Sequence, residues 1–169
     1  MKKNKLSLFI ASSFLLLLGA CAADYDANPE APDGRNPLQG EFKANIYGEP
    51  FTAEVKHFYD STLNDARNLT ISATQFNYDK DTSKYKMITL NIGHYEGPNV
   101  YYMSSGNARG YYIEKDGINL RNFSSTSQDT LGAITITGDQ AAWVGNFSFM
   151  AINGTDTIYV GDGSFNIPK

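Results

Sequence analysis

Hydrophobic and polar residues alternate along most of the chain after residue 40. The alternation is clearest at residues 69–74, 88–92 and 134–137, where Leu69, Ile71 and Ala73, for example, alternate with hydroxyl-bearing residues. A period of two is typical of antiparallel strands that bury one face and leave the other in water. Gly, Asn, Asp and Pro separate the apolar runs at fairly even intervals, which favours an all-β domain.

The pattern predicts strands near residues 41–47, 51–59, 68–77, 85–92, 100–103, 110–115, 132–137, 144–152 and 157–165, with a turn at residues 48–50. Helical periodicity is nearly absent, and only residues 61–67 are compatible with one or two helical turns, capped by Asp60 or Ser61. The predicted fold is an antiparallel β-sandwich or partly open barrel of about eight to ten strands. It forms a single domain over residues 41–169.

The N-terminal residues have a different pattern. Three lysines precede an apolar run over residues 6–18, and Cys21, the only cysteine, follows it. This layout is typical of a secretory signal, and the run is shorter than the ~20 residues that cross a bilayer. The ending Leu18-Gly19-Ala20-Cys21 resembles the bacterial lipoprotein signal, in which the cysteine thiol receives a diacylglycerol. Residues 1–20 are therefore predicted to be a signal peptide, and Cys21 the lipidated residue.

The two or three acyl chains of such a protein hold it firmly on a membrane. Ala22 follows the cysteine in place of the Asp that retains lipoproteins at the inner membrane. We therefore expect a bacterial outer-membrane protein on the periplasmic or the cell-surface side. Residues 21–40 are rich in proline and poor in apolar residues, which predicts a flexible tether.

The charge and the cysteine content limit the possible partners and the means of stabilisation. The formal net charge of −4 includes the three lysines of the signal, so the rest of the chain is more acidic still. Nucleic acid is not an expected partner, because its binding needs clustered basic residues. With its one thiol used for lipid, the domain must be stabilised by packing rather than by disulfides.

Candidates for catalysis are few. His57 and His94 are the only histidines, and with Asp60 and Glu96 they have the donor types of a zinc site. However, no close-spaced histidine pair and no Gly-x-Ser-x-Gly sequence occurs. We therefore predict no catalytic residue, no metal and no cofactor. A metal-dependent or hydrolytic enzyme using His57 and His94 with nearby carboxylates remains the alternative.

The tyrosines indicate a ligand-binding surface more strongly than the histidines indicate a catalytic site. Each of the pairs Tyr101-Tyr102 and Tyr111-Tyr112 places one ring on each face of its strand. If the two strands pair, tyrosines stack across the wet face, and exposed amphipathic rings of this kind bind sugars or proteins. The predicted ligand-binding residues are Tyr95, Tyr101, Tyr102, Tyr111 and Tyr112, unless these rings merely cover the sheet. The expected ligand is a glycan or an envelope protein.

Two further patterns concern single residues. The segments Asp60-Ser61-Thr62, Asp129-Thr130-Leu131 and Asp156-Thr157-Ile158 resemble the Asp-Ser/Thr-apolar sites that Bacteroidota-type bacteria O-glycosylate. They make Ser61, Thr130 and Thr157 candidate glycosylation sites, with chance as the alternative. Asp156 and Asp162 lie among glycines, but no run of alternating acidic ligands supports a calcium loop.

The C-terminal third carries a resemblance. It contains Gly132–Gly138, Val144–Phe149 and Ile158–Phe165, and related segments lie upstream at residues 44–53, 88–92 and 97–101. Together they resemble a family of small Bacteroidota-type outer-membrane lipoproteins with an all-β domain of unknown function. The resemblance implies an all-β fold and an outer-membrane location, and it implies no activity. Pro98, before Val100, departs from the family pattern.

Overall fold

The computed structural model describes residues 40–63, 65–76, 83–125 and 131–169. The predicted signal peptide, Cys21, the tether up to residue 39 and Thr130 lie outside the described residues.

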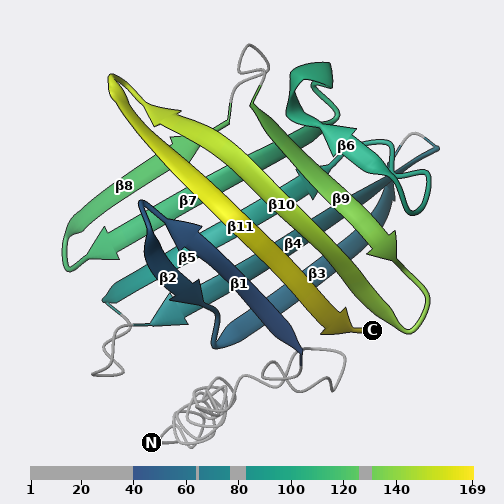
Figure 1. The fold of residues 1–169 in the computed structure, drawn as a ribbon, viewed down its shortest axis with the longest axis horizontal. Coiled ribbons are helices and arrows are strands. Elements are labelled where there is room, and N and C mark those ends of the chain that lie inside the picture. The colour runs from purple at the N-terminus through teal and green to yellow at the C-terminus, as the bar shows by residue number, and fades with distance from the viewer. Residues whose placement is uncertain (1–39, 64, 77–82, 126–130) are drawn as a thin grey trace, which may run out of the picture.

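Strands make up nearly all of the described chain (Figure 1). They are β1 (Glu41–Ile46), β2 (Glu49–Thr52), β3 (Val55–Leu63), β4 (Ala66–Phe76), β5 (Lys84–Ile92), β6 (Val100–Tyr102), β7 (Ala108–Asp116), β8 (Asn119–Ser124), β9 (Gly132–Gly138), β10 (Ala142–Asn153) and β11 (Asp156–Pro168), with a short 3₁₀ helix at Met103–Ser105. The prediction of an all-β domain is confirmed.

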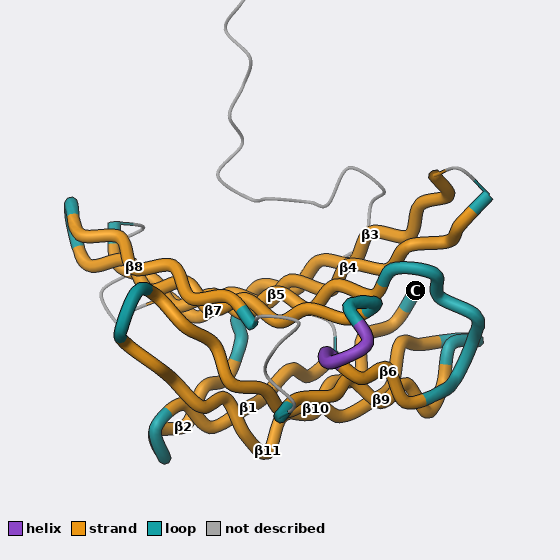
Figure 2. The backbone as a smooth tube through the Cα atoms, turned by 90° about the horizontal axis from the view of Figure 1, so that it is seen from above, coloured by secondary structure: helices purple, strands orange, loops and turns teal. Residues whose placement is uncertain are grey.

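The strands form one curled antiparallel sheet. Its order is β2-β1-β11-β10-β8-β7-β5-β4-β3, with β9 also paired to β10 and β6 paired to β9. The sheet folds over on itself into a half-barrel with two layers (Figure 2). The first layer holds β8, β7, β5, β4 and β3, and the second holds β2, β1, β11, β10, β9 and β6. The strands of the two layers cross rather than run alongside each other (Figure 1).

Several predicted elements differ from the structure. The strand expected at residues 51–59 is two strands, β2 and β3, and β8 was not predicted at all. Residues 61–67 are not helical, because they belong to the β3–β4 hairpin, in which Leu63 pairs with Ala66. The first turn is at Tyr47 and Gly48, whose φ angles of 55° and 83° are both left-handed. A two-residue turn of this kind matches the twist of a hairpin, so Glu49 and Pro50 lie within β2.

The core lies between the two layers and is rich in aromatic residues. Phe42 packs against Phe147 and Phe165, with ring centroids 5.0 and 6.2 Å apart. Gly163 lies beneath the ring of Phe147, and a Cβ there would come within 2.5 Å of it. Leu69, Ile71 and their neighbours on β5 cover the core from the first layer, as their alternation predicts.

A bulge divides β11 into two halves. Phe147 pairs with Gly163 and Phe149 with Val160, so that Gly161 and Asp162 together lie opposite Ser148. Before the bulge Ile158 and Val160 are buried, and after it Phe165 and Ile167 are buried. Even-numbered residues therefore face the core on one side of the bulge and odd-numbered residues on the other.

The two ends of β10 join the layers in different ways. Near its C-terminal end Ile152 pairs with Ser124 of β8. Beside this bridge the Gly110 amide donates to Ser125 Oγ (2.8 Å), and the Ser125 amide donates to the Gly110 carbonyl (2.8 Å). The ring of Phe149, from β10, packs directly on Gly110. We call this region the closed corner. The other end of β10 begins at Ala142 and Trp143, and we call it the open end.

Candidate functional site

A shallow groove lies on the outer face of the second layer, over β6, β9, β10 and β11. It consists of two adjoining hollows of about 390 and 270 Å³ that share Ala133, Ser148 and Tyr159. We call it the tyrosine groove. Its lining is Tyr102, Leu131, Gly132, Ala133, Thr135, Asn146, Phe147, Ser148, Tyr159, Asp162 and Gly163.

Two exposed tyrosine rings lie in this groove. Alternation on β6 buries Tyr101 and turns Tyr102 outward, where 59% of it is exposed. On β11 the same alternation turns Tyr159 outward, with 54% exposed. The Tyr159 ring lies over Gly161, where a Cβ would come within 2.5 Å of the ring carbon Cε1. Because glycine has no Cβ, the ring lies along the strand and presents its face to solvent.

The floor of the hollow that holds both rings consists of small residues. Ala133 and Ser148 lie on it, and their short side chains leave the hollow open. Asn146 and Thr135 supply an amide and a hydroxyl farther along the floor. Uncharged groups of this kind, beside an aromatic face, orient a ligand that has both C–H and O–H surfaces.

Asp162 places one carboxylate in the groove. It is the bulged residue of β11, and its φ of 49° lies in the left-handed region that an Asp tolerates better than most residues. Asn45 Nδ2 donates to its Oδ2 at 2.9 Å, which orients the carboxylate and leaves the other oxygen to accept hydrogen bonds from a ligand. Strain of this kind is often found at binding sites.

The five tyrosines predicted to bind ligand do not form one row. Tyr95, Tyr101 and Tyr112 are 4%, 8% and 2% exposed, so these three rings belong to the core. Tyr102 lies in the tyrosine groove, and Tyr111 is half-buried on the outer face of β7. The two strands do not pair, because β6 pairs with β9 and β7 with β5 and β8.

Tyr101 has a structural contact instead. Its hydroxyl donates to the Gly97 carbonyl at 2.6 Å and accepts from the Glu96 amide at 3.1 Å. These bonds fix the turn that contains Pro98. Val100, Tyr101 and Tyr102 then continue in regular register with β9.

The structure does not bring the two histidines together. His57 lies opposite Ser72, which lies opposite Thr89, whereas His94 follows the end of β5. With a rise of ~3.4 Å per residue, roughly 15 Å separates their positions. Both histidines are exposed, and Asp60 pairs with Arg67 rather than with His57. Within residues 40–63, 65–76, 83–125 and 131–169, no group of three His, Cys, Asp or Glu side chains could hold a metal ion.

Two of the candidate glycosylation residues fall within the described chain. Ser61 is half-buried on β3, and its neighbour Asp60 is engaged by Arg67. Thr157 is exposed near the start of β11, and its carbonyl accepts a hydrogen bond from the Tyr47 hydroxyl. Thr157 is therefore the more accessible of the two.

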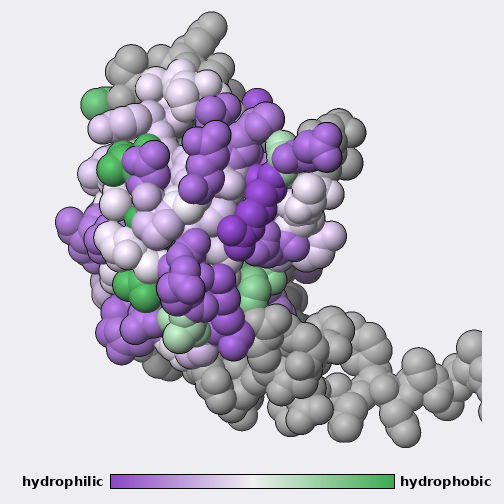
Figure 3. All heavy atoms as spheres, turned by 90° about the vertical axis from the view of Figure 1, so that its right-hand side faces the viewer, coloured by the Kyte–Doolittle hydropathy of each residue, from purple (hydrophilic) through white to green (hydrophobic). Residues whose placement is uncertain are grey.

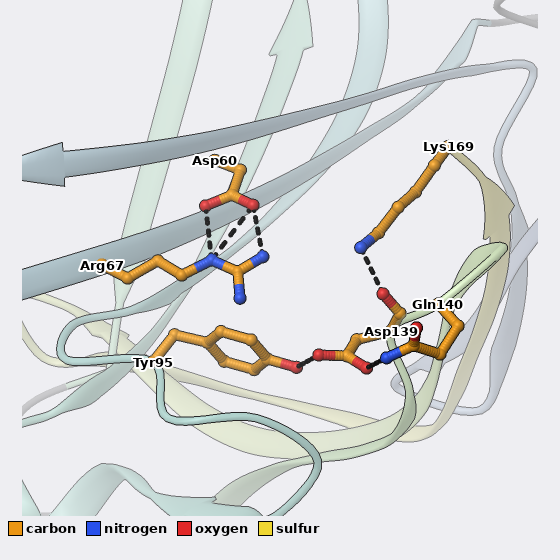
Figure 4. Close-up of polar contacts among 6 residues, drawn as sticks. All are labelled: Asp60, Arg67, Tyr95, Asp139, Gln140 and Lys169. Atoms are coloured by element: carbon orange, nitrogen blue, oxygen red, sulfur yellow. Dashed lines mark hydrogen bonds and ion pairs between the residues drawn. The ribbon is translucent and has the colours of Figure 1, made fainter.

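A polar cluster closes the open end of the half-barrel (Figure 4). Arg67, at the start of β4, donates to both carboxylate oxygens of Asp60 on β3, at 2.6 to 3.2 Å. The Tyr95 hydroxyl donates to Asp139 Oδ2 at 2.9 Å, and Lys169 donates to the Asp139 carbonyl. We call these residues, together with Trp143, the clasp.

Trp143 lies at the centre of the clasp and is fully buried. The Arg67 guanidinium is 5.6 Å from its ring centroid, and the Lys169 ammonium is 4.1 Å from it. The Tyr95 ring meets it edge-on at 5.4 Å. Cations above an indole face are attracted by its quadrupole, so Trp143 holds residues from both layers together.

The surroundings of two clasp residues, Asp60 and Tyr95, shift their pKa values. The hydrogen bond from Arg67 lowers the pKa of Asp60 below its usual value of 3.8. Burial raises the pKa of Tyr95, and its bond to Asp139 raises it further. Tyr95 is therefore a neutral hydrogen-bond donor at physiological pH. Figure 3 shows the outer surface of this end as mainly hydrophilic. Because the Arg67–Asp60 ion pair and the hydrogen bond from Tyr95 to Asp139 are both made within the clasp, we interpret it as a structural closure.

No protein-family model, no curated protein and no solved structure matches this chain. Across the described residues, none of the helical structure has the length and hydropathy that a bilayer span needs. The proposed function is therefore based on the geometry of the site and on the sequence.

Of the residues that line the tyrosine groove, sequence reasoning identified Tyr102. Among those it missed are Tyr159, Asn146 and Asp162, which supply the second ring, an amide and a carboxylate. Tyr159 is one of many tyrosines in the chain, and nothing in the sequence links it to Tyr102, which is distant along the chain. The signal that marks the site is Gly161-Asp162-Gly163, because a glycine-flanked Asp within a strand indicates a bulge.

Proposed function

We propose that this chain is a lipid-anchored protein of the bacterial cell envelope whose β-domain binds a glycan, without catalysis, in the tyrosine groove. The lipid on Cys21 holds it at the outer membrane, and the tether lets the domain stand away from the bilayer. The observation that carries the proposal is the pair of exposed rings, Tyr102 and Tyr159, in one hollow with a floor of small residues, which adjoins a second hollow lined by polar groups.

A sugar fits this arrangement better than an apolar molecule. The C–H face of a pyranose packs on an aromatic ring, and its hydroxyls bond to carboxylate and amide groups such as those of Asp162 and Asn146. A protein partner would need a larger and more continuous apolar patch than two rings and Leu131 supply.

The test is a glycan screen with the full lipidated chain in detergent micelles, followed by calorimetry on each hit. Replacing the ring in Tyr159→Ala should weaken binding at least about tenfold, which corresponds to ~1.4 kcal/mol. Tyr59→Ala is the matched control, because Tyr59 is 68% exposed but lies on β3 in the first layer. Absence of any glycan hit at millimolar concentration, or equal losses in both variants, would overturn the proposal.

The side of the membrane is tested separately. Protease treatment of intact cells, followed by a blot, should remove the domain if it faces outward and leave it intact if it faces the periplasm. The first result would direct the search to external glycans, and the second to those of the cell wall.

A further inference from the structure

A second groove lies on the opposite outer face, over β3, β4, β5 and β7. It has a volume of about 440 Å³, and its polar lining consists of Ser61, Asn68, Asn91, Asn107, Arg109 and Tyr111. These residues come from all four strands or from their ends. The first layer curves away from the second at both of its sides (Figure 2). We call it the arginine groove.

We propose that the arginine groove binds the carboxylate of an acidic sugar, with Arg109 as the group that recognises the charge. The site is independent of the tyrosine groove, which lies on the other layer and whose described lining contains no basic residue.

The first argument is charge. Arg67 and Arg121, the other two arginines that the structure describes, both form ion pairs with carboxylates. Arg109 is exposed, and no carboxylate of the described chain lies within ion-pair distance of it. Among the described residues that line the groove there is no Asp or Glu. A cation in a hollow of an acidic protein, with no carboxylate of the described residues paired to it, is suited to an anion supplied from outside.

The second argument is the donor set beside Arg109. Asn91 lies directly opposite Arg109 on β5, and Thr70 lies directly opposite Asn91 on β4. Thr70 Oγ1 donates to Asn91 Oδ1 at 2.6 Å, which occupies the amide oxygen. The NH₂ group of Asn91 is then what this side chain offers to a ligand. A guanidinium and an amide NH₂ are both donors, and they match the lone pairs of a carboxylate.

The third argument selects a sugar acid over a phosphate. Arg109 is the only basic residue in the part of the lining that the structure describes, so the site balances one negative charge and not two. Tyr111 lies two residues from Arg109 on the same face of β7, roughly 7 Å along the strand. Its half-buried ring and the neighbouring amides and hydroxyls can contact the body of a pyranose whose carboxylate is at Arg109.

The test compares four ligands by calorimetry on the full chain in micelles: glucuronate, galacturonate, glucose and acetate. We expect the two uronates to bind at millimolar concentration, more weakly at high salt, and glucose and acetate to bind at least about tenfold more weakly. Arg109→Gln should remove uronate binding, and Arg109→Lys should restore only part of it, because the bidentate geometry is lost.

Tyr159→Ala separates this site from the tyrosine groove, and uronate binding should survive it. Thermal melting of Arg109→Gln should match that of the unaltered protein, because Arg109 is exposed. Three results would overturn the inference: no uronate binding at millimolar concentration, equal binding of glucose or acetate, or unchanged uronate binding in Arg109→Gln.

Discussion

The two ends of β10 connect the same two layers by different means. At the closed corner the connection is made by backbone pairing and by close packing, with Phe149 placed directly on Gly110. At the open end no pairing between the described strands joins the layers, and side chains of the clasp connect them instead. The closed corner therefore depends on shape, whereas the open end depends on charge, aromatic faces and pH.

The largest effect is expected at the centre of the clasp. Trp143→Ala should lower the free energy of unfolding by about 3–5 kcal/mol, because it removes a fully buried ring that contacts both layers. Urea denaturation measures this loss. Trp143→Phe is the control: it keeps an aromatic face and removes an indole N–H that has no hydrogen-bond partner among the described residues. A loss below about 1 kcal/mol in Trp143→Ala would show that the open end contributes little.

An added methyl group at the closed corner should lower the free energy of unfolding. In Gly110→Ala the new Cβ would lie 2.7 Å from three atoms of the Phe149 ring. Since that ring is itself buried, we expect a loss of about 1–3 kcal/mol in the free energy of unfolding. Gly93→Ala is the matched control, because its nearest contacts would be 3.6 and 3.7 Å away. Equal melting temperatures in the two variants would contradict the role given to close packing.

The ion pair of the clasp should contribute less. Arg67→Gln and Asp60→Asn should each cost about 1 kcal/mol, because the pair is partly exposed, with side chains 39% and 30% accessible. A double-mutant cycle should give a coupling energy that falls as salt increases. A coupling energy of zero would mean that Arg67 acts only through the faces of Trp143 and Tyr95.

The smallest effect is a dependence on acidity. The folded-state pKa of Asp60 is lower than the unfolded value of 3.8. Its contribution to stability is therefore complete above that value and is lost as the pH falls below it, through the folded-state pKa. Melting temperatures of the unaltered protein and of Asp60→Asn should converge below pH 4. A constant difference down to the lowest pH measured would argue against the pair.

How far the sequence predicts this molecule depends on the range of the contact. Alternation identified the inward residues of β4, β5 and β9, because period two is a local property of a strand. It did not identify which strands are neighbours, and so it grouped Tyr102 with Tyr111 although they lie on different layers. It also left Arg67 inside a predicted helical turn, since its partners Trp143 and Tyr95 are distant in sequence. Both grooves depend on pairings of this kind, which only the folded chain reveals.

The bulge at Gly161 and Asp162 adds one residue to β11 relative to its neighbour β10. Deleting Gly161 would leave Asp162 alone opposite Ser148, so the alternation of β11 would run without interruption and Phe165 and Ile167 would still face the core. The change would fall on the outer face instead, because the glycine beneath the Tyr159 ring would be lost. The extra residue of β11 thus shapes the tyrosine groove and leaves the packing of the last strand in the core unchanged.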